Sequence, residues 1–338
     1  MKHDELEKLA DAVIAVIRKK PLQPFSFSWL ADEVESDIES VQQAVHHAAA
    51  WGYELEVRQN ERVTFVAPPD SLTATEIQYD LQTKWLGRNV LAYRSVKSTN
   101  DIAVEMANSG AVEGTIITAE QQTEGKGRLG RVWFSPMGSG IYVSAIFRPA
   151  FVPEYAPGMS IMTALALYEA VQNCSPSEPH LKTLSLKWPN DLMIGNRKLA
   201  GILTELATED RNIHHVVVGV GINVNECAED FPEELAGTAT SLRCELGRKF
   251  NRVDLLQSFL RSLEKQYETY LLHRLEKDHD RIRKYSMLIG KDITLQSGRM
   301  RMEGKVQDID ADGRLILETS NGVEKIIAGE VTIVKDPA

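Results

Sequence analysis

The sequence predicts a multidomain α+β chain with a mixed sheet in its central domain. Three observations support this prediction. Helical and strand patterns are intermixed from residue 71 to 283, short strands alone follow from 284 to 338, and a small helical segment precedes Pro68 and Pro69. Because 338 residues suffice for two or three domains of ordinary size, we place domains at 1–67, 71–283 and 284–338.

Residues 1–67 predict a winged helix-turn-helix. Apolar residues at helical spacing over Leu6–Ile17 indicate a first helix, and Ser36 or Asp37 can cap the last one. A hairpin that turns at Gln59–Glu61 would supply the wing. We expect the helix-turn-helix at Phe27–His46 to be the DNA-binding element of the chain.

The charge of this module opposes the DNA binding that its architecture predicts. The span Phe27–His46 contains no lysine or arginine, and residues 1–70 hold seven cations against thirteen acids, a net charge of −6. DNA affinity depends largely on cations that meet phosphates. Operator binding therefore stays open, with His46, His47 and dimerisation as features that could compensate.

The central domain is expected to begin with a helix that Thr73 and Glu76 cap and that reaches Leu81. Strand-like and helical patterns then intermix, which is typical of an α+β domain with a largely antiparallel sheet. The expected strands are Leu91–Tyr93, Thr115–Ala119, Ile141–Phe147, Ser185–Lys187, Asp191–Ile194, Lys198–Leu206 and His214–Gly219, and the expected long helices are Ser160–Val171 and Asp254–Leu272, with Asn251 as a cap.

The last 55 residues, 284–338, predict a small SH3-like β-barrel. Their hydrophobicity alternates with the period of two that strands require. Asp312-Gly313 and Asn321-Gly322 are sequences typical of hairpin turns.

Composition excludes several classes of protein. No run approaches the length of a membrane span, and the N-terminus MKHDELEKLA lacks the apolar core of a signal peptide. The three cysteines, Cys174, Cys227 and Cys244, form no C-x-x-C pair. We therefore expect no disulfide framework, no zinc site and no membrane partner, and a reducing cytoplasmic location.

The segment Glu120–Arg131, EQQTEGKGRLGR, is the most informative part of the chain. It combines three glycines with three cations in a chain whose net charge is −10. Glycine lets the backbone approach a ligand, and arginine binds anions in a bidentate fork. Its GxGxxG pattern does not indicate a dinucleotide fold, because polar residues precede it and Pro136 prevents a helix after it. The segment predicts a loop that closes over a carboxylate or phosphate, with an ordinary surface loop as the alternative.

Three further segments extend this prediction: Lys97–Asn100, Lys187–Leu203 and Val216–Asn223. In their order and spacing, the four segments resemble the bifunctional biotin protein ligases that also repress the biotin operon. The resemblance runs from about Leu9 to the C-terminus. It implies that biotin and ATP form biotinyl-5′-AMP, that a lysine of the biotin carboxyl carrier protein is the acceptor, and that Mg²⁺ assists. It also implies that the adenylate-bound chain is a homodimer, with biotin as corepressor and operator DNA as a second partner.

The resemblance assigns roles to residues of this sequence. It implies that biotin is bound by Ser98, Thr99, Asn100, Gln122, Lys126, Gly127, Arg128 and Lys198, and that the nucleotide is bound by Arg128, Arg131, Trp133, Lys187, Asn190 and Asn223. It implies that Lys198, Arg128 and Asp191 are catalytic, with Asp191 as the Mg²⁺ ligand. Helix capping by Ser98–Asn100, core packing of Trp133 and a plain turn at Asn190 are the structural alternatives.

The chemistry explains why cations should gather at such a site. An acid must be activated before an amine attacks it, and negative charge builds at the α-phosphate as pyrophosphate leaves. Lys198, beside an apolar strand, needs a partner or a ligand if it is buried. A ligand-sensing transcription regulator without catalysis and a lipoate ligase are the competing hypotheses, and the segments GKGRLGR and KWPND favour biotin.

Overall fold

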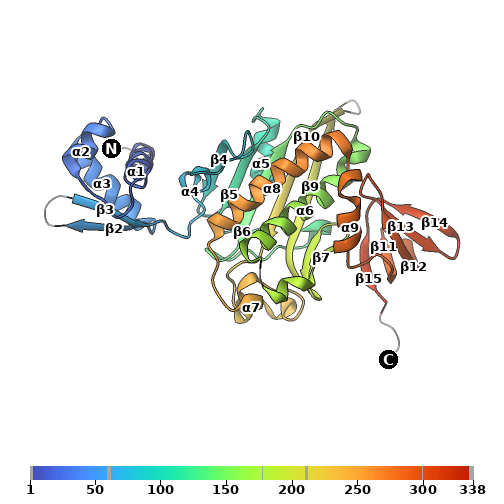
Figure 1. Cartoon of the computed structure of the whole chain (residues 1–338). Coiled ribbons are helices and arrows are strands. Elements are labelled where there is room, and N and C mark those ends of the chain that lie inside the picture. The colour runs from blue at the N-terminus through green and yellow to red at the C-terminus, as the bar shows by residue number, and fades with distance from the viewer. Residues whose placement is uncertain (1–2, 59–61, 177, 210–211, 299, 335–338) are drawn as a thin grey trace. The chain divides into compact units, whose positions relative to one another are not determined.

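The structure, a computed structural model, describes residues 3–58, 62–176, 178–209, 212–298 and 300–334. The chain divides into two compact units, Met1–Tyr79 and Asp80–Ala338 (Figure 1). The boundary lies beyond the double proline, because the short helix that follows the prolines belongs to the first unit.

The first unit contains three helices, a three-stranded antiparallel sheet and one further short helix. In chain order these are α1 (His3–Ile17), β1 (Pro24–Ser26), α2 (Phe27–Glu33), α3 (Ile38–Ala50), β2 (Glu54–Arg58), β3 (Arg62–Ala67) and α4 (Ala74–Gln78), with strand order β1-β3-β2. Asp37 caps α3 by accepting a hydrogen bond from the Ser40 amide. The turn predicted at Gln59–Glu61 lies outside the described residues.

Helix α4 is held against the first unit by a buried carboxylate. Thr73 caps it as predicted, but it ends at Gln78 instead of reaching Leu81. The Glu76 side chain accepts two hydrogen bonds of 2.6 Å from Arg18 and one of 2.6 Å from Tyr53. Glu76 is 1% exposed, so its charge needs these partners. The linker residues after Pro69 are thus packed rather than free.

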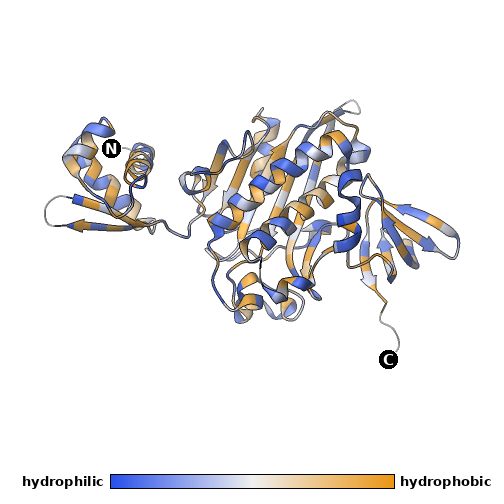
Figure 2. Cartoon of the chain, viewed as in Figure 1, coloured by the Kyte–Doolittle hydropathy of each residue, from blue (hydrophilic) through white to orange (hydrophobic). Residues whose placement is uncertain are grey.

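The second unit is built on a seven-stranded sheet of order β4-β5-β6-β10-β9-β8-β7. The strands are β4 (Asn89–Tyr93), β5 (Thr115–Ala119), β6 (Ile141–Phe147), β7 (Leu184–Lys187), β8 (Asp191–Ile194), β9 (Arg197–Glu209) and β10 (Asn212–Ile222). Only β4 and β5 are parallel neighbours among these described strands. All seven predicted strands are confirmed, and in Figure 2 the strands of this sheet are largely hydrophobic.

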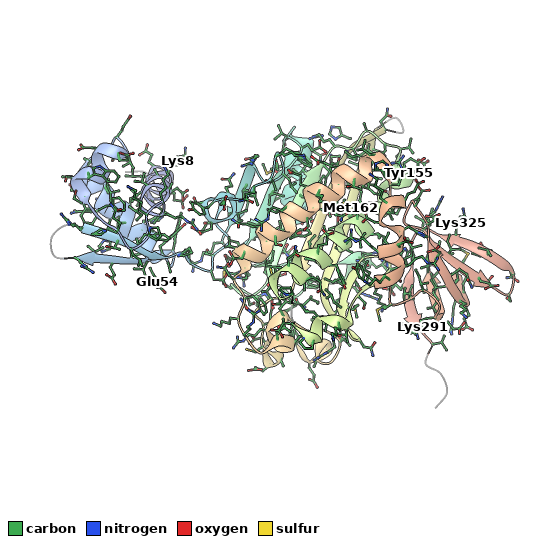
Figure 3. All side chains as sticks on the ribbon, in the orientation of Figure 1. Lys8, Glu54, Tyr155, Met162, Lys291 and Lys325 are labelled. Carbon is green, nitrogen blue, oxygen red and sulfur yellow. The ribbon has the colours of Figure 1, made fainter. Side chains whose placement is uncertain are left out.

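Helices cover both faces of this sheet. The helices of the unit are α5 (Thr99–Asn108), α6 (Ala156–Cys174), α7 (Leu242–Leu246), α8 (Arg252–His273) and α9 (His279–Tyr285). Helices α6 and α8 pack together in front of the strands in Figure 1, and Met162 of α6, labelled in Figure 3, is 1% exposed. Helix α5 packs on β5, β6 and β10 from the opposite face. It begins at Thr99, with Ser98 as its N-cap residue.

The chain ends in a five-stranded antiparallel sheet. Its strands are β11 (Asp292–Ser297), β12 (Met300–Ile309), β13 (Leu315–Thr319), β14 (Gly322–Ile326) and β15 (Glu330–Ile333), in the order β14-β13-β12-β11-β15. The Trp188 indole donates to the Gly313 carbonyl oxygen at 2.9 Å and so joins this sheet to the larger one. No helix within the described ranges is long and apolar enough to cross a bilayer.

Candidate active site

A cavity of about 540 Å³ lies in the second unit, where α5, the glycine-rich loop, β8, β9 and β10 meet. Every residue for which the sequence predicted a ligand-binding or catalytic role lines it. These residues are Ser98, Thr99, Asn100, Gln122, Lys126, Gly127, Arg128, Arg131, Trp133, Lys187, Asn190, Asp191, Lys198 and Asn223. Segments that are up to 125 residues apart in the chain therefore contribute to a single site.

Two glycines of β10 make room for side chains of the cavity. A Cβ atom at Gly219 would overlap the Asn100 side-chain oxygen, and one at Gly221 would overlap the Trp133 indole nitrogen. Both glycines have negative φ, so the reason for glycine is close approach and not backbone conformation. The sequence VVVGVGIN thus combines a buried strand with two positions where neighbouring side chains cross it.

One end of the cavity is a continuous hydrogen-bond network. The Gln122 Oε1 atom accepts from the Thr99 amide at 2.9 Å and from the Thr99 hydroxyl at 3.1 Å. Asn100 donates through Nδ2 to Glu205 at 2.7 Å, and Ser144 donates to Asn100 Oδ1 at 2.6 Å. Ser98 is the N-cap residue of α5, but its side chain makes no capping hydrogen bond. The capping alternative is therefore wrong for the Ser98 hydroxyl, and Ser98 is one of the residues that line the cavity.

The other end of the cavity carries charge. Lys198 Nζ lies 2.6 Å from Asp191 Oδ1 and 5.4 Å from the centre of the Trp133 ring. Lys198 is the second residue of β9, and Asp191 is the first residue of the neighbouring strand β8. The Lys198 side chain is 32% exposed, so a ligand can reach it. Trp133 packs over Gly201 and Gly221 and also lines the cavity.

The glycine-rich loop is folded back on itself and contacts the C-terminal sheet. The Gly127 amide donates to the Arg131 carbonyl oxygen at 2.7 Å, and no helix follows, as predicted. Arg128 donates to Asn190 Oδ1 at 3.1 Å and to the Gly329 carbonyl oxygen at 3.4 Å. Arg131 forms an ion pair with Glu330. Burial lowers the pKa of the Arg128 guanidinium, which shows that its charge is partly desolvated.

The remaining predicted residues differ in how they are held. Asn223 donates to the Thr240 carbonyl oxygen at 2.9 Å, so its amide also supports a neighbouring loop. Asn190 likewise donates to the Ile202 carbonyl oxygen at 2.7 Å. Lys187 lines the cavity, and no ion-pair partner for it is found among the residues that the structure describes.

The sequence did not predict the contribution of the C-terminal sheet to the cavity. The residues from 329 to 332, at the start of β15, form part of its lining. Glu205 and Ser144, which hold Asn100, were missed as well. None of these residues belongs to a spaced motif, and the register of strands from distant segments brings them to the site.

Two family models match the chain. The Biotin/lipoate A/B protein ligase family matches residues 92–223, and the Biotin protein ligase C terminal domain matches residues 288–334. These two ranges include every lining residue of the cavity except Phe231, Leu235, Thr238 and Ala239.

Whole-chain comparisons agree with these matches. The Bifunctional ligase/repressor BirA of Bacillus subtilis is 33% identical over 282 residues, which cover 83% of this chain and 85% of the relative. The Biotin--[acetyl-CoA-carboxylase] ligase of Mycobacterium tuberculosis is 34% identical over 238 residues, covering 69% and 85%. A solved structure of biotin protein ligase from Aquifex aeolicus in complex with biotin and ATP superposes with a TM-score of 0.62 at 26% identity, covering 74% of this chain and 100% of the other. The chain therefore belongs to the biotin protein ligase family.

Proposed function

We propose that this chain is an ATP-dependent biotin–protein ligase that transfers biotin to a lysine of the biotin carboxyl carrier protein of a carboxylase. The observation that carries the proposal is the position of Lys198 and Arg128 at one end of a cavity whose other end is lined by the neutral polar side chains of Thr99, Asn100 and Gln122. Biotin has the matching polarity, with a carboxylate at one end and a neutral cyclic urea at the other.

In the first step, a carboxylate oxygen of biotin bonds to the α-phosphorus of ATP. The bond between that phosphorus and the bridging oxygen breaks, and pyrophosphate leaves with the electron pair. Lys198 and Arg128 neutralise the charge that develops on the phosphate oxygens. In the second step, the amine of the acceptor lysine attacks the acyl carbon, AMP leaves with the electrons of the C–O bond, and the nitrogen loses a proton to water.

The proposed binding sites follow the two ends of the cavity. Biotin contacts the residues around Ser98–Asn100 and Gln122, and the glycine-rich loop covers it through Lys126, Gly127 and Arg128. The nucleotide lies on the side of Trp133, Arg131, Lys187, Asn190 and Asn223. The neutral amides and hydroxyls suit the ureido ring, which offers two donors and one acceptor.

Asp191 suits a magnesium ion that ATP carries. Mg²⁺ is bound in such sites by one or two carboxylates together with phosphate oxygens. Asp191 is a single carboxylate beside the cavity, and the part of the chain that the structure describes holds no group of three His, Cys, Asp or Glu that could bind a metal alone. The ion would add charge neutralisation at the phosphates, while the Lys198 ammonium, 2.6 Å from Asp191, keeps that carboxylate oriented.

We also propose that the first unit is a winged helix-turn-helix and that the last five strands form an SH3-like barrel. The order of α1–α3 and the β2–β3 hairpin support the former, and the small antiparallel sheet supports the latter. The domains remain 1–67, 71–283 and 284–338 in this proposal, with α4 as a linker helix attached to the first unit.

A second candidate function is repression through operator DNA by a dimer of the adenylate-bound chain. Its support is the printed name of the relatives, bifunctional ligase/repressor. Asp37 and Glu39 at the start of α3 are exposed and oppose phosphate contact. We expect Ile38→Arg with Gln43→Lys to strengthen operator binding and to steepen its salt dependence. Nanomolar, biotin-dependent operator binding by the unmodified chain at physiological salt would show that the acidic helix does not limit repression.

The ligase proposal is tested by transfer. Full-length protein, ATP, Mg²⁺ and a biotin carboxyl carrier domain are incubated with biotin or with lipoate, and the carrier mass is measured. The proposal predicts a mass increase of one biotinyl group with biotin only. An increase with lipoate only would favour the lipoate ligase, and tight biotin binding without any transfer would favour the non-catalytic regulator.

A further inference from the structure

Glu205 and Ser144 hold the Asn100 amide from opposite sides. Glu205 lies on β9 and Ser144 on β6, with β10 between them. In the strand register, Ser144 pairs with Gly219, and Glu205 pairs with Val217, two residues away on the same face of β10. The Asn100 side chain therefore crosses β10 above Gly219, which has no Cβ to obstruct it.

The carboxylate of Glu205 fixes the direction of this amide. A carboxylate accepts hydrogen bonds and does not donate them, so Asn100 must present Nδ2 to Glu205, at 2.7 Å. The Asn100 oxygen then faces Ser144 and can only accept. Ser144 has one hydroxyl proton, and the shorter of its two hydrogen bonds, at 2.6 Å, is the one to Asn100.

The order continues from Ser144 to Thr99. The Ser144 hydroxyl also donates to the Thr99 hydroxyl oxygen at 2.8 Å, so its one proton is shared between Asn100, at the shorter distance, and Thr99. The Thr99 hydroxyl donates to Gln122 Oε1, whose identity as an acceptor is fixed by the Thr99 amide. The Thr99 proton therefore stays within the protein. Thr99 thus offers lone pairs, and no donor, to the cavity.

Charge at the same place orients a ligand. Lys126 of the glycine-rich loop is hydrogen-bonded to Asp101. Its pKa is raised mainly by that hydrogen bond and, to a smaller extent, by the charge of the Glu205 carboxylate. A ligand carboxylate is repelled from the Glu205 end and attracted toward Lys198.

On the basis of the proposed function, we propose that Glu205 is a positioning residue that sets this end of the cavity as a hydrogen-bond acceptor. It selects acids whose ring carries N–H donors, as the cyclic urea of biotin does, and disfavours acids whose ring has none, such as lipoate. If residue 205 were neutral and able to donate, Asn100 could turn over. The Ser144 proton, now shared between Asn100 and Thr99, would then go to Thr99 alone, and this stronger hydrogen bond would weaken Thr99 as an acceptor for a ureido N–H.

The test is a double-mutant cycle in the full-length protein, with Glu205→Gln, Ser144→Ala and the combination, measured by biotin-dependent pyrophosphate release. Glu205→Gln keeps the side-chain shape, and we expect it to raise the KM for biotin about tenfold, the effect of about one hydrogen bond, with kcat and the KM for ATP unchanged. The same factor is expected for desthiobiotin, which has the same ureido ring. Glu105→Gln, at an exposed position of α5, is the matched control and should change none of these values.

Coupling distinguishes positioning from a general structural role. Because Glu205 acts through Ser144, Glu205→Gln should raise the KM for biotin by less than about twofold when Ser144 has already been replaced by Ala. An unchanged KM for biotin, or full additivity of the two substitutions, would overturn the inference. Absence of biotin-dependent pyrophosphate release by the wild-type protein would instead overturn the proposed function, so the two failures are distinguishable.

Discussion

At the scale of single residues, the cavity depends on small side chains as much as on charged ones. Gly219 and Gly221 lie two residues apart on β10 and admit Asn100 and Trp133, which come from α5 and from the segment after the glycine-rich loop. The glycines therefore determine where the ligand-binding side chains can lie.

Gly219→Ala should weaken biotin binding without unfolding the chain. The new methyl group would overlap the Asn100 oxygen, so the amide would lose its bonds to Glu205 and Ser144. We expect the KM for biotin to rise by about tenfold or more and the melting temperature to fall. Adding Asn100→Ala removes the overlap and should restore part of the lost stability in a thermal unfolding experiment. A single mutant with wild-type KM would show that the cavity does not depend on this close approach.

Glu226 is a buried carboxyl group with a pH-dependent effect on stability. It is fully buried, its Oε2 atom has no hydrogen-bond partner among the described residues, and burial raises its pKa from 4.5 to about 7. Between pH 4.5 and 7 the folded chain keeps a proton that the unfolded chain has lost. The ionisation of Glu226 therefore lowers the free energy of unfolding as the pH rises through this window, and it causes no further change above pH 7.

Glu226→Gln should remove this pH dependence. The free energy of unfolding at pH 8 should increase by up to about 3 kcal/mol, since the amide carries no charge to desolvate. Urea unfolding at pH 5 and pH 8 measures the free energy of unfolding of both proteins. Glu229→Gln, at an exposed position, is the control. A mutant that is less stable than wild type at pH 8 would contradict the assignment of a destabilising buried charge.

The residues of the site could be predicted only where they belong to spaced motifs. All fourteen of those residues line the cavity. Glu205 and Ser144 could not be predicted, because their role depends on which strands are neighbours and on a register that sequence spacing does not reveal. The local role of Glu76 was misassigned, since the pattern Thr73-x-x-Glu76 permits a capping box, while Glu76 uses its carboxylate for Arg18 and Tyr53.

At the scale of elements, the glycine-rich loop and the start of β15 act together. Arg128 and Arg131 reach Gly329 and Glu330, so a loop near residue 130 and a strand near residue 330 contact each other across the cavity. The Arg131–Glu330 pair is largely exposed, and exposed ion pairs contribute little, typically below about 1 kcal/mol. The loop is therefore held weakly until an anion binds its arginines.

Limited trypsin digestion should detect this ordering. We expect cleavage after Arg128 and Arg131 in the free protein and at least severalfold slower cleavage with biotin plus ATP, because three glycines give the loop little intrinsic order. Cleavage after the exposed Arg301, in the C-terminal sheet, is the internal control. Equal rates at the loop with and without ligands would contradict closure. Arg128→Gly should also release more free adenylate into solution, because the lid no longer closes.

At the scale of the whole molecule, the ligand-binding residues all lie within the unit Asp80–Ala338. The number and type of the strands in this unit were predictable, since its segments have clear apolar periods. The three-residue strand β1 was missed because Pro24–Ser26 is too short for a pattern. The packing of α4 in the unit that ends at Tyr79 could not be predicted, because it depends on the contacts of Glu76 and not on the prolines.

A chain that lacks residues 1–79 should keep biotin transfer at least in part. The deletion removes one compact unit together with its attached helix α4, and leaves the cavity lining intact. The measurement is biotin transfer to the carrier domain by the chain that lacks residues 1–79. A chain that lacks residues 1–70, and so keeps Glu76 but not its partner Arg18, is measured for comparison. Complete loss of adenylate formation in the shorter chain, with its fold retained by circular dichroism, would show that the first unit contributes to the site.

The central claim is that Lys198 stabilises the charge that develops when biotin attacks ATP. Single-turnover pyrophosphate release with ATP, Mg²⁺ and biotin tests this claim most directly. The rate of the wild type is compared with that of Lys198→Gln, and Lys182→Gln, outside the cavity lining, is the control. We expect the rate to fall by about 10²–10³ in Lys198→Gln, the effect of removing one group that stabilises developing charge, with an unchanged melting temperature. A wild-type rate of pyrophosphate release from folded Lys198→Gln protein would contradict the account.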